Sequence, residues 1–270
     1  AYTSLSIDAP WDLPSLQDMN GYDIVVWAQA NRGFSSIEAE NLLRAYLNGG
    51  GRLLICGQDI GLYDGDTELY TDYFHAEYIH DDAAAKAASG ANPLAGAEIT
   101  FGGAGSSQRP EGSPSSYMPD IISPAMDSAI PCAYYSGGQV AGLAVSPCGS
   151  PYYRVIYLAF GLESVSPGDQ LYQMVDQAIQ WLNKASETYA VHVSPGDASG
   201  SGEIGRSHVY YQTITNMGAL SDTFELSIQN SDWDVTIWNE DLTQQITDTG
   251  TLAPCEKNTI AVKVDVPNTA

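Results

Sequence analysis

A strand–helix–strand pattern between Tyr22 and Asp59 constrains the fold of this chain more than any other feature. The segments Tyr22–Ala28 and Arg52–Cys56 are almost continuously apolar, which is typical of parallel strands covered on both faces. Between them, apolar residues recur at helical spacing over Ser36–Leu47, and three glycines then end the pattern. Two apolar strands joined by an amphipathic helix predict a right-handed βαβ unit.

A second strand and helix extend this unit. Arg154–Phe160 is strongly apolar, and the stripe that begins at Asp169 predicts the strongest helix of the chain. The stretch Asp81–Ser128 is rich in small residues and predicts long loops or small edge elements. Near the N-terminus, Tyr2–Ile7 predicts a strand, and no helix is expected before Tyr22. Residues 1–186 are therefore predicted to form an α/β domain with a flavodoxin-like, mostly parallel sheet.

The pattern changes to a period of two after residue 187. Alternating apolar residues mark strands near Val191, Phe224, Val235 and Val262, and turn clusters separate them. Short alternating strands at this spacing predict an antiparallel β-sandwich over residues 187–270.

The charge of the chain excludes some partners. A formal net charge of -23 disfavours nucleic acid and anionic membrane surfaces, because both attract basic proteins. The apolar runs are too short for membrane insertion. An acidic surface suits a secreted protein, and cation binding stays open as an alternative.

The four cysteines are too scattered for a zinc site or a dense disulfide framework. Cys132 and Cys148 flank a predicted hairpin and are the best candidates for a bridge. Cys56 ends a buried strand, and Cys255 lies in the second predicted domain.

At the carboxyl ends of the predicted strands, the chain resembles the class I glutamine amidotransferase-like family. The resemblance is carried by Leu54-Ile-Cys-Gly57 and Phe160-Gly-Leu-Glu163. It implies a cysteine nucleophile at Cys56 and a catalytic acid at Glu163, but Gly161 stands where the family has its histidine. A thiol needs an imidazole or an equivalent cation to be held as thiolate, so the catalytic site is interpreted as degenerate.

Two other histidines leave an enzymatic alternative open. His75 and His80 follow the strand that ends in Cys56 and could supply a base from outside the usual order. In that case the chain would be a peptidase-associated hydrolase with Cys56 as its nucleophile. Otherwise Cys56 is a small buried apolar residue.

The segment Gly49–Asp59 also resembles amidotransferase-like modules of secreted multidomain bacterial proteins, and Thr213–Gly218, Asp222–Phe224 and Leu252–Pro254 resemble bacterial extracellular immunoglobulin-like repeats. The resemblance implies an extracellular or cell-surface location, with other domains of a parent protein or neighbouring subunits as partners. The first βα unit of this fold is missing from the sequence, which is either a fragment or completed by another segment or chain; we favour the addition of a strand beside Tyr22–Ala28.

Two ligand classes remain as weaker expectations. Asp64, Asp66 and Glu68 form a short acidic turn that could hold calcium, although they lack the spacing of an EF-hand. Trp238 and Tyr210 could contribute to a carbohydrate-binding surface. No other cofactor is expected.

These observations favour a non-catalytic structural or binding module, with no catalytic residues of its own. The hydrolase described above and a subunit of an extracellular filament are the alternatives.

Overall fold

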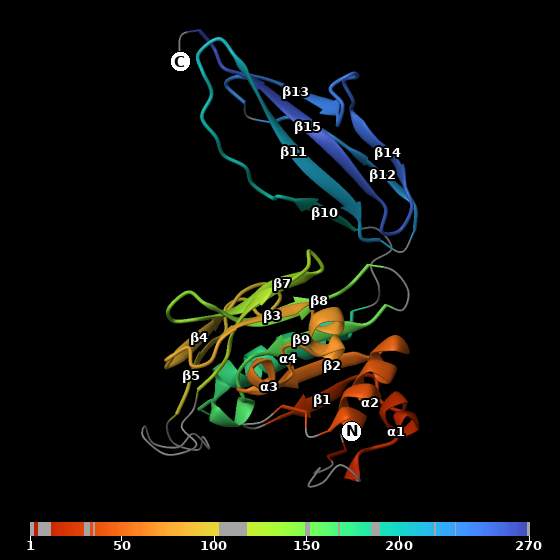
Figure 1. Cartoon of the computed structure of the whole chain (residues 1–270), viewed down its shortest axis with the longest axis vertical. Helices are drawn as coiled ribbons and strands as arrows, with labels where there is room; N and C mark the ends of the chain where they lie inside the picture. The colour runs from red at the N-terminus through yellow and green to blue at the C-terminus, as the bar shows by residue number, and fades with distance from the viewer. Residues whose placement is uncertain are drawn as a thin grey trace. The chain divides into compact units, whose positions relative to one another are not determined.

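The computed structural model describes residues 3–4, 12–29, 33–34, 36–102, 118–148, 152–166, 168–184, 190–218, 220–229 and 231–268. The chain divides into two compact units, Ala1–Lys184 and Ala185–Ala270 (Figure 1). Among the described residues, no helix has the length and apolar character needed to cross a membrane.

The first unit is built on a mixed nine-stranded sheet. Its parallel part contains β1 (Val25–Ala28), β2 (Arg52–Cys56) and β9 (Arg154–Leu158), in that order. The antiparallel part continues from β9 through β8 (Val140–Val145), β7 (Ala129–Tyr135), β4 (Ala87–Gly90) and β5 (Glu98–Thr100). Two further strands branch from this order: β6 (Ile121–Pro124) pairs with β8, and β3 (Ala76–His80) pairs with β6.

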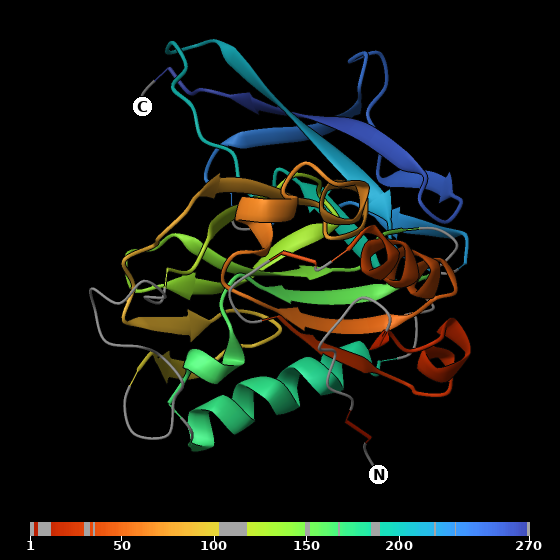
Figure 2. The same cartoon turned by 60° about the horizontal axis from the view of Figure 1, so that its bottom comes forward.

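Helices cover both faces of this sheet. They are α1 (Leu16–Asn20), α2 (Ile37–Asn48), α3 (Ile60–Asp64), the π-helix η2 (Leu69–Tyr73), the 3-10 helix η3 (Leu162–Ser164) and α4 (Asp169–Leu182). In Figure 2, α4 lies along one face of the sheet. The side chains of β2 alternate between two cores: Leu53 and Ile55 pack in the core that contains α2, whereas Leu54 and Cys56 pack in the core that contains α4.

The structure corrects two expectations for this unit. The sheet is mixed rather than mostly parallel, because the tight β7–β8 hairpin places an antiparallel strand beside β9. A helix does precede Tyr22: Ser15 caps α1 through a capping box with Asp18. The stretch Asp81–Ser128, for which long loops or small edge elements were expected, contains the short strands β4, β5 and β6 in its described part. The predicted strand Tyr2–Ile7 lies outside the described residues.

The second unit is all-β in its described part. One antiparallel sheet has the order β10 (Val191–Ser194), β11 (Ser207–Asn216), β15 (Lys257–Asp265) and β13 (Asp234–Asn239), and β12 (Asp222–Glu225) pairs with β14 (Asp248–Leu252) in another. Asn216 is fully buried, and its amide nitrogen donates hydrogen bonds to the carbonyl oxygens of Leu220 and Leu252.

Candidate functional site

Cys56 is the last residue of β2 and lies at the carboxyl edge of the parallel strands, where α/β sheets bind ligands. The turn is tight, because a Cβ at Gly57 would lie 2.7 Å from the carbonyl oxygen of Gln29. The Gly57 N–H donates to the carbonyl oxygen of Leu158 at 3.2 Å, which ties the loop to β9. Cys56 itself is 0% exposed.

The surroundings of Cys56 favour the protonated thiol over the thiolate. Burial raises the pKa of Cys56 to about 12, and the Glu163 carboxylate adds to the rise. A nucleophilic cysteine requires the opposite shift, which a cation or an imidazolium beside the sulfur would supply. The thiol of Cys56 is therefore protonated at neutral pH.

Glu163 occupies the space where the resemblance expects the base. A Cβ at Gly161 would overlap the carboxylate of Glu163, which therefore lies over the main chain at this position. The structure thus brings Cys56 and the predicted acid Glu163 together, with an acceptor carboxylate at the position of the missing imidazole.

The two candidate histidines have other partners. His75 Nδ1 lies 2.6 Å from Ser128 Oγ, and His75 Nε2 lies 2.9 Å from the carbonyl oxygen of Asp72. His80 is exposed, and its Nδ1 contacts the carbonyl oxygen of Asp81. Neither histidine is among the groups that shift the pKa of Cys56.

The predicted bridge between Cys132 and Cys148 is wrong. Cys132 is a free and fully buried thiol on β7, in the same core as Cys56. Cys148 is disulfide-bonded, and so is Cys255. The side chain of Cys132 points into an apolar layer, so the hairpin geometry that suggested the bridge does not present its sulfur to the outside.

A cluster of three carboxylates lies beside this loop. Asp59, Asp81 and Asp120 each bring one carboxylate oxygen within 4.8 Å of the others. Asp59 follows β2, Asp81 follows β3, and Asp120 precedes β6, which is antiparallel to β3. Three segments distant in sequence therefore meet at one edge of the sheet.

Hydrogen bonds hold both the main chain and the side chain of Asp120 in place. Its N–H donates to the carbonyl oxygen of Gln58 at 3.0 Å, and its carbonyl oxygen accepts from the Tyr135 hydroxyl at 3.0 Å. Its Oδ2 accepts hydrogen bonds from the N–H groups of Gly61 at 2.7 Å and Leu62 at 3.2 Å. The side chain is thus fixed while it is 0% exposed.

The cluster is electrostatically unfavourable without a cation or protons. Two unit charges this far apart repel by roughly 3 kcal/mol at an effective dielectric constant of about 20. Burial raises the pKa of Asp120 to about 8, and the carboxylates of Asp59 and Asp81 contribute to this rise. Burial also raises the pKa of Asp59. Among the described residues, no Lys, Arg or His side chain forms an ion pair with any of the three.

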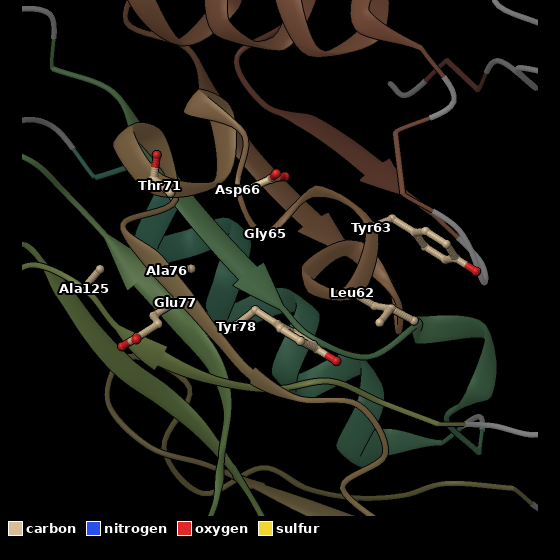
Figure 3. A pocket seen from close by; sticks show the side chains of 9 residues that line it. All are labelled: Leu62, Tyr63, Gly65, Asp66, Thr71, Ala76, Glu77, Tyr78 and Ala125. Atoms are coloured by element: carbon tan, nitrogen blue, oxygen red, sulfur yellow. The ribbon is translucent and has the colours of Figure 1, made fainter.

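An open pocket of about 570 Å³ adjoins α3 and β3 (Figure 3). Tyr78 lies against α3, where a Cβ at Gly61 or Gly65 would come within 2.8 or 3.1 Å of its side chain. Burial raises the pKa of Tyr78, and the charges of Asp120, Asp81 and Asp59 raise it further. Tyr78 thus lines the pocket and also lies near the carboxylate cluster. The pocket is lined by Leu62, Tyr63, Gly65, Asp66, Thr71, Ala76, Glu77, Tyr78 and Ala125.

The predicted calcium residues have separate roles. Asp64 Oδ2 accepts a hydrogen bond from the Phe34 N–H at 2.7 Å, and Glu68 forms an ion pair with Arg44. Asp66 lies on the rim of the pocket. The carboxylates that do gather in the described structure are Asp59, Asp81 and Asp120, which the sequence reasoning missed as a group.

The predicted carbohydrate residues do not form an open platform. Trp238 and Tyr210 are both half-buried, the Trp238 indole donates to Thr236 Oγ1, and Tyr210 stacks edge-on against His208.

Comparisons with known proteins give distant likenesses. No family model matches the chain, and no curated protein matches it. A β-galactosidase from Rahnella sp. R3 is 13% identical with a TM-score of 0.38, and the match covers 91% of this chain and 33% of that one. This chain therefore spans about a third of the length of that enzyme.

Two shorter solved structures match the chain in part. The mmIFT52 N-terminal domain is 12% identical with a TM-score of 0.42, covering 64% of this chain and 82% of that one. A ThuA-like protein from Bacteroides uniformis is 11% identical with a TM-score of 0.41, covering 62% and 72%. At these values the likenesses carry no information on activity or substrate.

Proposed function

We propose that this chain is a non-catalytic structural or binding module of a secreted or cell-surface multidomain protein. In this proposal, its first domain is a degenerate class I glutamine amidotransferase-like domain and its second is an immunoglobulin-like domain. The partners are other domains of the parent protein or neighbouring subunits.

The main support for this proposal is the buried thiol of Cys56. Cys56 is fully buried, its pKa is raised to about 12, and a carboxylate lies where the family has an imidazole. A nucleophile in this state can neither reach a substrate nor ionise at neutral pH.

Alkylation of the native chain by iodoacetamide at pH 7.5 tests the proposal, with mass spectrometry to locate the modified residue. Cys132 is the internal control, because it is a second free, buried thiol in the same core. We expect both cysteines to be modified only in urea and at the same denaturant-dependent rate. Fast, selective modification of Cys56 in the native chain would instead support the hydrolase.

The disulfide-bonded state of Cys148 and Cys255 supports an extracellular location. Structural disulfides persist in oxidising compartments and are rare in the cytosol of mesophiles. The acidic surface, with a formal net charge of -23, agrees with this location.

Assembly by strand addition has its own support at β1. This strand pairs with β2, and it has no second strand partner among the described residues. The Gln29 N–H donates to the carbonyl oxygen of Cys56 in β2. Because N–H groups along a strand point alternately to its two sides, those of Val26 and Ala28 face away from β2. Val26 is 52% exposed. An unpaired edge of this kind can accept a strand from a neighbouring subunit, as in a filament.

Substitution of Val26 by proline tests this assembly. Proline removes an N–H that faces away from β2, so the fold should be retained while the outer ladder is blocked. We expect light scattering to show concentration-dependent assembly of the original chain and of a Val26→Thr control, and a monomer for Val26→Pro. A chain that is monomeric at every concentration would contradict assembly through β1.

A further inference from the structure

Two of the three clustered carboxylates carry buried oxygens that have no hydrogen-bond partner. Asp120 Oδ1 and Asp81 Oδ1 are both inaccessible and unpartnered among the described residues. A buried acceptor without a partner loses its hydration and gains nothing in return, so native structures rarely leave one unexplained. In this cluster two such oxygens occur on neighbouring carboxylates.

The protein supplies donors to the opposite oxygen of Asp120. Oδ2 of Asp120 receives two backbone N–H groups, from Gly61 and Leu62, while Oδ1 on the same carbon receives none. Gly61 is required for this arrangement, since a Cβ there would lie 2.9 Å from Asp120 Oδ2 and 2.8 Å from the Tyr70 hydroxyl. The fold therefore orients Asp120 and leaves one of its oxygens for another partner.

The spacing of the cluster fits an ion of the size of calcium. Calcium binds six to eight oxygens at about 2.3 to 2.6 Å, so two of its ligand oxygens lie up to about 5 Å apart. The three carboxylate oxygens all lie within 4.8 Å of one another. Magnesium requires near-octahedral geometry at about 2.1 Å and keeps several waters, which suits a cluster this wide less well.

We propose that Asp59, Asp81 and Asp120 bind one calcium ion, which holds the loop after β2, the end of β3 and the start of β6 together. The ion would partner the two unpaired oxygens and offset the mutual repulsion of the three carboxylates. Asp120 would be the fixed ligand, and the less buried Asp81 would lie nearer to solvent.

Isothermal titration of the full chain with CaCl2 at pH 7.5, after removal of metals with EDTA, tests the proposal. We expect saturable binding of one ion per chain, with a dissociation constant between about 10⁻⁵ and 10⁻³ M. Asp81→Asn and Asp120→Asn should each weaken binding by at least about tenfold, because each removes a charged ligand. Asp81→Asn is the more informative variant, since it leaves the hydrogen bonds of Asp120 to Gly61 and Leu62 intact.

Asp66→Asn is the matched control, because it removes the same charge from an exposed position near α3. We expect its calcium affinity to stay within about twofold of the original. Thermal unfolding in EDTA shows which variants are folded, and addition of calcium should raise the Tm of the original chain and of Asp66→Asn but not of Asp81→Asn.

Three results would overturn the proposal. One is the lack of saturable calcium binding by the original chain. Another is an equal loss of affinity in Asp66→Asn and Asp81→Asn, which would indicate attraction by the general negative charge. A third is tighter binding of MgCl2 than of CaCl2 in the same titration.

Discussion

Cys56 ends β2 and Asp59 lies three residues later in the loop that follows, yet their surroundings are opposite. Cys56 faces the core that contains α4, where apolar side chains seal its thiol. Asp59 lies with two further carboxylates that retain unpartnered oxygens. One edge of the sheet therefore holds an unreactive, buried thiol at Cys56 and, three positions later, a carboxylate at Asp59 that belongs to the proposed calcium site.

Two glycines at this edge make the comparison testable. A Cβ at Gly61 would meet Asp120 Oδ2, and a Cβ at Gly161 would meet the Glu163 carboxylate. Asp120 is buried and held by four hydrogen bonds, whereas the Glu163 residue is exposed and meets the added methyl group with the far end of its side chain. The same substitution should therefore have very different effects at the two positions.

Gly61→Ala should have the largest effect. The new methyl group would lie within 2.9 Å of the Tyr70 hydroxyl, the Tyr78 ring and Asp120 Oδ2, none of which can retreat without breaking other contacts. We expect the free energy of unfolding to fall by roughly 2 kcal/mol, as overpacked sites do. Urea denaturation in EDTA measures this loss.

Gly196→Ala is the control for the substitution itself. A Cβ at Gly196 would meet just one atom, the carbonyl oxygen of Val193 at 4.0 Å. Its free energy of unfolding should change by less than about 0.5 kcal/mol. If Gly61→Ala were equally neutral, Asp120 would not be held as rigidly as its hydrogen bonds indicate.

Asp64→Asn should have an intermediate effect that depends on pH. Burial raises the pKa of Asp64 from 3.8 to about 6, and Glu40 and Asp66 add to the rise. The folded chain therefore binds this proton more tightly than the unfolded chain, and the resulting stabilisation is full below about pH 4 and lost as the pH rises through about 6.

Asparagine does not ionise, so the substitution removes this loss of stability. Its amide oxygen can still accept the hydrogen bond from the Phe34 N–H. At pH 7 in EDTA, after a discount for partial exposure, Asp64→Asn should be more stable than the original chain by roughly 1 kcal/mol. At pH 4 the two should be equal. Urea denaturation at both pH values checks this, with Asp176→Asn, at an exposed position on α4, as the control. A constant difference between the two pH values would refute the assignment to Asp64.

Gly161→Ala should have the smallest effect. The methyl group meets only the far end of the exposed Glu163 side chain. The backbone at Gly161 has φ of -79° and ψ of 132°, which alanine adopts readily. We expect a change of less than about 0.5 kcal/mol in the free energy of unfolding. A loss as large as that of Gly61→Ala would show that Glu163 is held in place and that the contrast between the two glycines is wrong.

The sequence predicted the parts of the fold that have strong periodicity. The apolar strands β2 and β9 and the amphipathic α2 and α4 were expected, because burial on both sides of a sheet imposes recognisable patterns. Between β3 and β7 the sequence predicted only long loops or small edge elements and did not locate the strands. Segments such as Ala87–Gly90 consist of small residues whose pairing is decided by distant partners.

The candidate site was predicted in part. Cys56 and Glu163 lie close together, because Cys56 ends β2 and Glu163 follows the adjacent parallel strand β9; their predicted catalytic roles stay a prediction. The group of Asp59, Asp81 and Asp120 could not be found, since its members are distant in sequence and meet through the antiparallel β3–β6 pair. The short acidic turn instead favoured a site at Asp64, Asp66 and Glu68. These residues are close in sequence, but their carboxylates have separate partners and surroundings.

A crystal structure of the chain grown with calcium tests both sides of the loop in one measurement. We predict an ion at about 2.4 Å from an oxygen of each of Asp59, Asp81 and Asp120, with Cys56 buried in its apolar core. A cluster that stays free of calcium, or an imidazole nitrogen within hydrogen-bonding distance of the Cys56 sulfur, would contradict it.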